Sequence, residues 1–565
     1  MNFRSPCSFI ISFLLCYFIP GNTFAQSTEK PSFTHADTLR GTNGPYRKLW
    51  DVLKYEITVK PDFNTKTIEG KNKMLFFDNG AKLMQIDFQE PMLLDSVVDE
   101  NRHYNFRREG NVYWLEFRDT AAMYKIKPGQ RSITMFFHGK PRVAVNPPWD
   151  GGWIWKKDAN GNPWMSVACQ GLGASVWYPC KDIQSDEPDS GAIQHIIVPD
   201  SLVAVGNGRM TEKHSLKDGT TMYSWQVKAP INNYCIIPYI GKYVHFGEIF
   251  KGENGNLNMD YWVLDYNLEK AKKQFTQAPQ MMKAFEYWFG PYPFYKDGFK
   301  LVEAPHLGME HQSATAYGNQ YKNGFNPGKS HASWTGTKWE QQFDFIIVHE
   351  SGHEWFANNI TAKDITDNWI HESFTCYSEV LFVEYQFGKK AGEEYFLGSQ
   401  RNILNKQPMI GQYGVNVDGD LDIYYKGSTI INMIRAVIDD DKKFREILRG
   451  LNKAFYHQTV TTQQIENYIS QNAKKDLSKV FDQYLRTKDI PILEYKIDNH
   501  NVSYRWDSTI AGFNLPIKVS FGKPSGVEQW IKPTGEWQML ALGDWFDGKT
   551  LMLNKNFYVK LKQLE

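Results

Sequence analysis

Residues 348–356 read VHESGHEWF and contain an HExxH motif. The apolar residues on both sides of this motif predict a helix over residues 343–358. Because positions i and i+4 share one face of a helix, His349 and His353 can direct two imidazoles at one metal ion. Glu350 lies about 100° around the helix from His349, within reach of a metal-bound water without itself binding the metal. The motif therefore predicts a hydrolytic metal site.

A catalytic zinc site needs a third protein ligand and one open position. Downstream, residues 368–374 read NWIHESF, and 18 residues separate Glu372 from His353. This is enough chain for a connection and a second helix that returns a carboxylate to the metal. His371 is a competing ligand, but the apolar spacing of the residues that follow it favours Glu372.

The combination of HExxH, the 18-residue gap and W-x-x-E resembles the zinc aminopeptidase family of aminopeptidase N and leukotriene hydrolase, which are gluzincin metallopeptidases. The family's Y-x-K-G motif matches residues 424–427, YYKG, in full. Its G-x-M-E-N motif matches residues 307–311, LGMEH, at Met309 and Glu310. Where the family has Gly-Asn after HExxH, this sequence has Ala357 and Asn358. Residues 169–182 also resemble the family's segment that lines the substrate site.

The resemblance implies a metal and a chemistry. It implies one zinc ion per chain with the ligands His349, His353 and Glu372. Glu350 would act as the general base that takes the proton of a zinc-activated water. Tyr424 would donate a hydrogen bond to the oxyanion, and Tyr425 is the alternative because the two tyrosines are adjacent.

The resemblance also implies how a substrate is recognised. The Glu310 carboxylate would bind the free α-ammonium group of a peptide, and the backbone at Gly308 and Met309 would border the substrate. Gln170 would face the pocket for the first side chain or the amine. Glu379 lies two helical turns after Glu372, so it can either accept a proton from a ligating histidine or be solvated.

The predicted fold class is α+β and multidomain. Strand-like alternation runs from residue 46 to 247, helical spacing recurs over 268–289, 372–387 and 429–436, and alternation returns after Pro491. We expect an N-terminal β-sheet domain over residues 40–247, a thermolysin-like, mainly helical catalytic domain over 248–490, and a small C-terminal β-sandwich-like domain over 491–565. Residues 26–45 are polar and read as a leader into the fold.

The N-terminus predicts export. Arg4 is the only charged residue before Glu29, and the apolar run of residues 9–19 is too short to cross a bilayer comfortably. Residues 23–25 resemble a cleavage site, so we expect a signal peptide over residues 1–25 and a periplasmic or extracellular location. An uncleaved anchor is the alternative. No later stretch has 18 uninterrupted apolar residues, so no stable membrane span is expected after cleavage.

Composition excludes some functions. The 565 residues include 64 Lys+Arg and 63 Asp+Glu, a net charge of +1, whereas general nucleic-acid binders carry a basic excess. After cleavage four cysteines remain, which are too few for a disulfide-built scaffold. Cys169 and Cys180 can either form a disulfide or be buried free thiols.

The resulting hypothesis is an exported zinc metallo-aminopeptidase that hydrolyses N-terminal residues from peptides with a free N-terminus. One alternative is an epoxide hydrolase like leukotriene hydrolase, which shares the zinc site. A thermolysin-type endopeptidase is another, although it predicts neither the Met-Glu motif nor Y-x-K-G. A pseudoenzyme that uses the fold only for binding is a third alternative. It would normally have lost part of the HExxH motif, which is intact in this sequence. No coiled coil or obvious interface stripe appears in the sequence.

Overall fold

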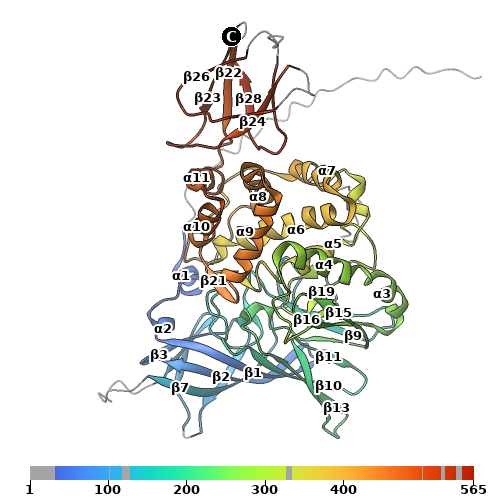
Figure 1. Ribbon diagram of the computed structural model, residues 1–565. Coiled ribbons are helices and arrows are strands. Elements are labelled where there is room, and N and C mark those ends of the chain that lie inside the picture. Colours follow the sequence, from blue (N-terminus) through green and yellow to red (C-terminus); the bar gives the residue numbers. More distant parts are fainter. Residues whose placement is uncertain are drawn as a thin grey trace, which may run out of the picture.

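The computed structural model describes residues 32–100, 102–117, 128–325, 334–498, 501–522, 528–542 and 550–565. Figure 1 shows a strand-rich N-terminal part, a middle part made mostly of helices, and a small C-terminal β part at the far end of the helices. This arrangement confirms the predicted α+β fold class. The predicted signal peptide lies outside the described residues.

The N-terminal part contains three sheets. The largest has seven strands in the order β12 (Arg209–Ser215), β13 (Thr220–Val227), β10 (Ala192–Pro199), β1 (Trp50–Asp62), β2 (Thr67–Asp78), β7 (Gly129–Gly139) and β4 (Leu93–Val98). A second has four: β11 (Val203–Val205), β14 (Tyr239–Gly241), β9 (Pro163–Ala168) and β8 (Gly152–Lys157). The third has three: β3 (Leu83–Asp87), β6 (Val112–Glu116) and β5 (Phe106–Glu109).

Alternating burial explains why these segments form strands. Along β1, buried residues such as Val52, Tyr55 and Ile57 alternate with more exposed ones, so one face of the strand enters the core. The chain reaches β1 through two short helices, α1 (His35–Gly41) and α2 (Pro45–Lys48). Part of the polar segment read as a leader is therefore helical and packed.

A five-stranded sheet begins the catalytic part. Its order is β15 (Tyr243–Gly252), β16 (Gly255–Leu264), β17 (Phe299–Glu303), β19 (Thr315–Tyr317) and β18 (Gly308–Met309). The predicted division at residue 247 falls inside β15, which pairs along its whole length with β16. The short β18 forms the edge of this sheet and carries two of the predicted substrate-site residues.

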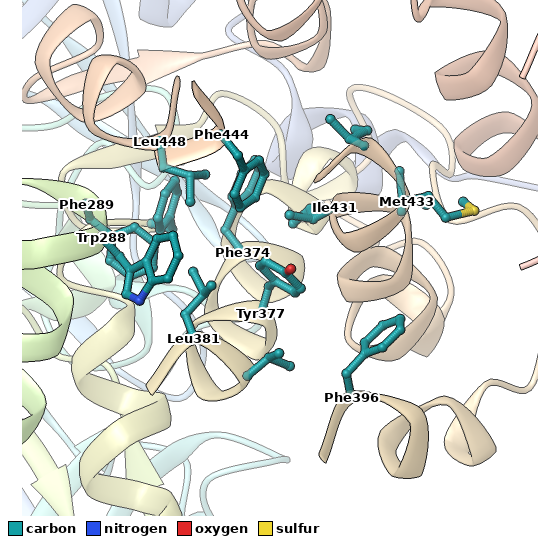
Figure 2. Close-up of a cluster of buried hydrophobic side chains, with 14 of the residues drawn as sticks. Trp288, Phe289, Phe374, Tyr377, Leu381, Phe396, Ile431, Met433, Phe444 and Leu448 are labelled. Atoms are coloured by element: carbon teal, nitrogen blue, oxygen red, sulfur yellow. The ribbon is translucent and has the colours of Figure 1, made fainter. Parts of the chain in front are cut away.

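The α-helices of the catalytic part are α3 (Leu268–Gln274), α4 (Gln277–Phe289), α5 (Phe345–Gly352), α6 (Trp369–Phe387), α7 (Lys389–Ser399), α8 (Tyr425–Ile438), α9 (Asp441–Ala454), α10 (Thr462–Ala473) and α11 (Ser478–Arg486). Among these helices, α4, α5, α7 and α8 pack directly on α6. Figure 2 shows Phe374, Tyr377 and Leu381 of α6 among side chains from α4, α7, α8 and α9. A short parallel pair, β20 (Ile360–Ala362) with β21 (Gln458–Val460), lies beside these helices.

Two predicted helices differ from the observed ones. The helix expected over residues 268–289 is divided into α3 and α4, with Pro279 in the first turn of α4. Inside a helix, proline lacks the N–H for the backbone hydrogen bond and clashes with the carbonyl of the preceding turn. Neither problem arises in the first turn, so proline fits at the start of α4. The helix expected over residues 343–358 is shorter, since α5 ends at Gly352. His353 still has helical dihedral angles, φ −64° and ψ −18°, so the HExxH spacing is preserved.

Ala357 has a strained backbone. Its φ is 144°, in a region that favours glycine, and the residue is buried. Ala357→Gly is therefore expected to raise the free energy of unfolding by about 1 kcal/mol, measured from urea unfolding. Ala362→Gly, in β20, is the control and should lower it, because that strand carries no such strain. Equal destabilisation by both substitutions would contradict this reading of Ala357.

The C-terminal part contains two small sheets. One has the order β26 (Gln538–Ala541), β23 (Asn501–Asp507), β22 (Ile492–Asp498) and β28 (Lys560–Gln563), and the other β25 (Gln529–Ile531), β24 (Ile517–Phe521) and β27 (Leu551–Leu553). Their inward residues, such as Leu493 and Val519, continue the hydrophobic core of the helices. Across the described ranges, no helix combines the length and apolar character needed to cross a membrane.

Candidate metal centre and substrate site

Helix α5 is held at its start by a buried carboxylate. Asp344 is the N-cap, and its Oδ1 accepts hydrogen bonds from the backbone N–H of Ile346 (3.2 Å) and from Asn319 (2.8 Å). Its Oδ2 accepts from Tyr317 (2.7 Å) and Gln274 (2.8 Å). Burial raises the pKa of Asp344 to about 6. These bonds join α5 to β19 and α3, so the HExxH motif starts from a fixed point.

Close packing of α5 on α6 brings the metal-binding side chains together. A Cβ added to Gly352 would lie 2.6 Å from Ser378 Oγ on α6, so only glycine allows this approach. His349 then lies beside Glu379, with 2.7 Å between His349 Nδ1 and Glu379 Oε1. Glu379 also accepts a hydrogen bond from Tyr395 (2.6 Å). Of the two roles open for Glu379, the structure shows contact with the histidine rather than exposure to solvent.

His353 is oriented in the same way. Its Nδ1 lies 3.0 Å from the carbonyl oxygen of Phe356 and 3.1 Å from Thr375 Oγ1. The Nε2 atoms of both histidines are thereby left to face Glu372 on α6. Such contacts to the other ring nitrogen fix the orientation of metal-binding imidazoles.

The three donor groups have the spacing of a zinc site. Glu372 Oε2 lies 3.7 Å from His349 Nε2 and 3.5 Å from His353 Nε2. Tetrahedral zinc with bonds of about 2.0–2.1 Å places neighbouring ligand atoms about 3.4 Å apart. Glu372 Oε2 is buried and has no hydrogen-bond partner among the described residues. Burial alone would raise the pKa of Glu372, but the nearby His353 and His349 lower it. This orphaned oxygen and the donor spacing fit a bound zinc ion.

His371 takes no part in this donor set. Its Nε2 accepts a hydrogen bond from the backbone N–H of Ala362 (2.8 Å), and its side chain is buried. Burial lowers the pKa of His371 to about 3. The His371 and Glu372 side chains thus leave α6 in different directions, and only Glu372 faces the two histidines of the HExxH motif.

Glu350 lies against the backbone of β18. A Cβ added to Gly308 would lie only 2.6 Å from Glu350 Oε1, so a side chain at this position would force the carboxylate to move. Burial, and then repulsion from Glu310, raise the pKa of Glu350 to about 7, although His349 opposes the shift. Glu310, Glu350 and His353 offer donor atoms within 4.8 Å of one another. The predicted general base and amine anchor therefore lie in one cluster with the candidate metal ligands.

Glu310 is held by side chains from the N-terminal part. Its Oε1 accepts hydrogen bonds from Gln170 (2.5 Å) and Tyr234 (2.9 Å), and its backbone oxygen accepts from Asn358 (2.8 Å). Burial raises the pKa of Glu310. The Met309 side chain belongs to the N-terminal hydrophobic core, so this residue can border a substrate only through its backbone.

Tyr424 and Tyr425 point in different directions. The Tyr424 ring lies nearly parallel to that of His349, with 6.2 Å between centroids. The Tyr425 ring packs edge-on against Trp334 at 5.0 Å. Burial, and then the charge of Glu372, raise the pKa of Tyr424. Of the two tyrosines, Tyr424 is the one that lies beside the metal ligands.

The glycine of Y-x-K-G has a packing role. A Cβ added to Gly427 would overlap the Ser373 hydroxyl, so α8 can approach α6 this closely only with glycine. Ser373 donates a hydrogen bond to the carbonyl of Ile423 (2.7 Å), the residue before Tyr424. This contact ties the start of α8 to the residue after Glu372.

Sequence reasoning missed two residues near this site. Tyr234 follows Asn232 and Asn233 in a short helical turn, and no motif marks it. Cys376 lies one turn after Glu372 on α6, and its thiol is within 4.8 Å of donor atoms of His349 and Glu379. The four cysteines at 169, 180, 235 and 376 are all free and buried, which answers the open question on Cys169 and Cys180.

Comparison with known proteins gives a consistent result. Residues 273–484 match the Peptidase family M1 domain. This part of the chain therefore contains a peptidase family M1 domain. This confirms the resemblance stated from the motifs, because the matched M1 domain includes α5, α6 and the start of α8.

Proteins similar to this chain include aminopeptidase B of Mus musculus, 23% identical over 354 residues, covering 58% of this chain and 50% of that protein. Leukotriene A-4 hydrolase of Xenopus laevis is 20% identical, covering 61% and 57%. The crystal structure of an M1 zinc metallopeptidase from Deinococcus radiodurans has a TM-score of 0.65 at 16% identity, covering 80% of this chain and 96% of that one. The chain thus spans about half the length of the curated relatives and shares its fold with the solved structure.

Proposed function

We propose that this M1 chain is a zinc aminopeptidase that removes the N-terminal residue from peptides with a free amine. The observation that carries the proposal is the position of Glu310, buried and within 4.8 Å of donor atoms of Glu350 and His353. An internal peptide nitrogen carries no charge, whereas a free N-terminus offers this carboxylate a cation.

Charge balance supports the same substrate. Three carboxylates, Glu310, Glu350 and Glu372, are buried, and each has a donor atom within 4.8 Å of one of His353. A doubly charged metal ion offsets two of these charges, and an α-ammonium group offsets the third. A buried carboxylate without a partner is costly, so this cluster favours a ligand with one positive charge. This argument favours the aminopeptidase over the endopeptidase alternative, whose substrates bring no such charge.

The chemistry is divided among the residues of this site. Zinc, when bound, lowers the pKa of water and polarises the scissile carbonyl. The Glu350 carboxylate takes a proton from the attacking water and later delivers it to the leaving amine. Its raised pKa, about 7, suits a group that must both accept and release a proton. Glu310 holds the substrate amine, and the Gln170 and Tyr234 hydrogen bonds hold Glu310.

Tyr424 would stabilise the negative charge that develops on the carbonyl oxygen. Tyr424→Phe is expected to lower kcat by about 100-fold with little change in KM, because the hydroxyl acts mainly on the tetrahedral state. Steady-state kinetics on an aminoacyl arylamide measure this split. Tyr425→Phe is the matched control and should be mild, since its ring packs on Trp334. The reverse pattern would exchange the roles of the two tyrosines.

The metal can be tested apart from activity. Chelation is expected to abolish hydrolysis and added zinc to restore it, while His353→Ala should lose the single zinc ion found by elemental analysis. His371→Ala is the control, because His371 is buried and lies beside Glu372 in the sequence, but its ring contacts the Ala362 backbone and not the metal site. Zinc should therefore remain in this variant. One zinc per chain in His353→Ala would refute the ligand set.

We also propose that the protein is exported, with cleavage after Ala25. Support comes from the sequence alone, namely the short apolar run of residues 9–19 and the small residues at the cleavage position. Mass spectrometry of the secreted or periplasmic protein tests it: a mature N-terminus at Gln26 is expected. A chain that keeps residues 1–25 would support the uncleaved-anchor alternative.

A further inference from the structure

A segment before the first strand is built into the wall of the substrate site. We call residues 34–48 the strap. Its helix α1 begins with a capping box between Thr34 and Asp37. Arg47, which is fully buried, donates to the carbonyls of Arg40 (3.2 Å) and Thr42 (2.8 Å) and pairs with Asp87 (2.6 Å). The pair with Asp87 fixes the strap to β3 of the N-terminal part, and the two carbonyl contacts hold the strap's own conformation.

Arg40 extends from the strap to the loop that carries Gln170. This loop, residues 169–173, is called the substrate loop below. Arg40 Nη2 donates to the carbonyl of Leu172 (3.4 Å), and Arg40 pairs with Asp182, 3.4 Å between Nη1 and Oδ1. Gly173 lies so close to Arg40 that any Cβ there would collide with the guanidinium. The substrate loop is therefore shaped around the Arg40 side chain.

The other end of the substrate loop makes the contact that matters for binding. Gln170, two residues before Leu172, donates to Glu310 Oε1 (2.5 Å). The loop is closed by a hydrogen bond from the Gly173 N–H to the Cys169 carbonyl (2.6 Å), so its two ends move together. Any shift of Leu172 is thereby passed to Gln170 and its contact with Glu310.

The strap also meets a loop of the catalytic part. The backbone of Gly41 packs so tightly on residues 414–416 that any side chain at this position would collide with them. From that loop, Asn416 donates to the carbonyl of Gly171 in the substrate loop (3.2 Å). In Figure 1, α1 lies where the strand-rich part meets the helices. Strap, substrate loop and catalytic loop therefore form a three-way contact.

Behind this contact the structure is not closely packed. A cavity of about 510 Å³ is lined by the strap together with Gly171, Leu172, Asn416 and Val417. The Leu172 side chain packs against the N-terminal hydrophobic core, but the cavity leaves one side of the substrate loop without close packing. On that side, the Leu172 carbonyl accepts hydrogen bonds from Arg40 (3.4 Å) and Gln89 (2.7 Å).

We propose that Arg40 is a positioning residue for substrate binding, which holds the substrate loop so that Gln170 and Glu310 are set to receive the free N-terminal amine of a peptide. The strap thus contributes to substrate binding by positioning the substrate loop. This inference rests on the proposed aminopeptidase function, which it deepens. Arg40 acts through Leu172 and Gln170, so its loss should impair binding of the amine and leave the chemistry at Glu350 in place.

Kinetics of three variants of the full mature chain test the proposal. Arg40→Ala is expected to raise KM for an aminoacyl arylamide about tenfold with kcat within about twofold, because ground-state binding is what it loses. Arg40→Lys keeps the charge but loses the planar guanidinium group, so its KM should lie between those of the wild type and Arg40→Ala. Lys48→Ala, which removes an exposed cation of the same strap, should behave as wild type. Parallel losses of kcat and zinc content in Arg40→Ala would overturn the proposal.

Hydrogen exchange gives a readout that needs no activity. In Arg40→Ala the amides of Gly173 and Ser175 should exchange at least about tenfold faster than in Lys48→Ala, while amides of β10 stay unchanged. Unchanged exchange at Gly173 would overturn the proposal, as would faster exchange without any change in KM. If the wild type hydrolyses no arylamide, the proposed function fails, and the exchange result still decides whether Arg40 holds the loop.

Discussion

Glu350→Gln is expected to keep one zinc ion per chain and to lose at least about 100-fold in kcat. Glutamine has the same shape, so it can keep the close packing against Gly308, where a Cβ would lie 2.6 Å from the carboxylate oxygen. It cannot accept the proton of the attacking water, which is the step that a general base supplies. Paired measurements of zinc content and kcat on a free-amine arylamide test this.

A matched control comes from the neighbouring buried glutamate. Glu354 is also buried, its pKa is also raised to about 7 by burial, and it accepts hydrogen bonds from Tyr292 (2.7 Å) and the Ser313 N–H (2.9 Å). Its carboxylate makes these structural contacts, so Glu354→Gln should change kcat only a few-fold. Near-normal turnover in Glu350→Gln would remove this residue from the mechanism.

The sequence alone could group the candidate metal ligands, because the spacing of the two histidines is a local feature of the chain. Two histidines four positions apart must share a helix face, and this holds even though α5 ends at Gly352 rather than extending to residue 358. The third ligand came from spacing and motif together. What the sequence could not show is why the helices approach so closely, since that depends on Gly352 facing Ser378 and Gly427 facing Ser373 across α6.

Contacts between distant segments were largely out of reach. Tyr234 donates a hydrogen bond to Glu310, 76 positions later in the sequence, and neither the residue types nor their spacing predicts this contact. The polar composition of residues 26–45 favoured a leader, yet Arg40 and the buried Arg47 anchor the strap. A polar segment can be ordered when its charges find partners on a folded surface, and composition does not reveal such partners.

Glu310 should make the enzyme discriminate between free and blocked N-termini. Wild type is expected to cleave an aminoacyl arylamide and to leave its N-acetyl derivative nearly untouched. Acetylation removes the cation, so the buried Glu310 charge has no ionic partner in the complex, at a cost of roughly 3–5 kcal/mol. That cost corresponds to a loss of about 100-fold or more in kcat/KM. Both substrates can be compared in the same assay at matched enzyme concentration.

Variants at this residue separate charge from shape. Glu310→Gln keeps the size of the side chain but removes its charge, so kcat/KM on the free amine should fall about 100-fold and the gap to the blocked substrate should narrow. Tyr234→Phe, which removes one hydrogen bond to Glu310 and no charge, should cost about tenfold. Glu310→Gln, which removes the charge, should therefore lower kcat/KM more than Tyr234→Phe, which removes only a hydrogen bond. If wild type cuts acetylated or internal bonds efficiently, Glu310 does not select for the amine. The endopeptidase alternative would then replace the aminopeptidase, since the zinc ligands and Glu350 serve both reactions equally.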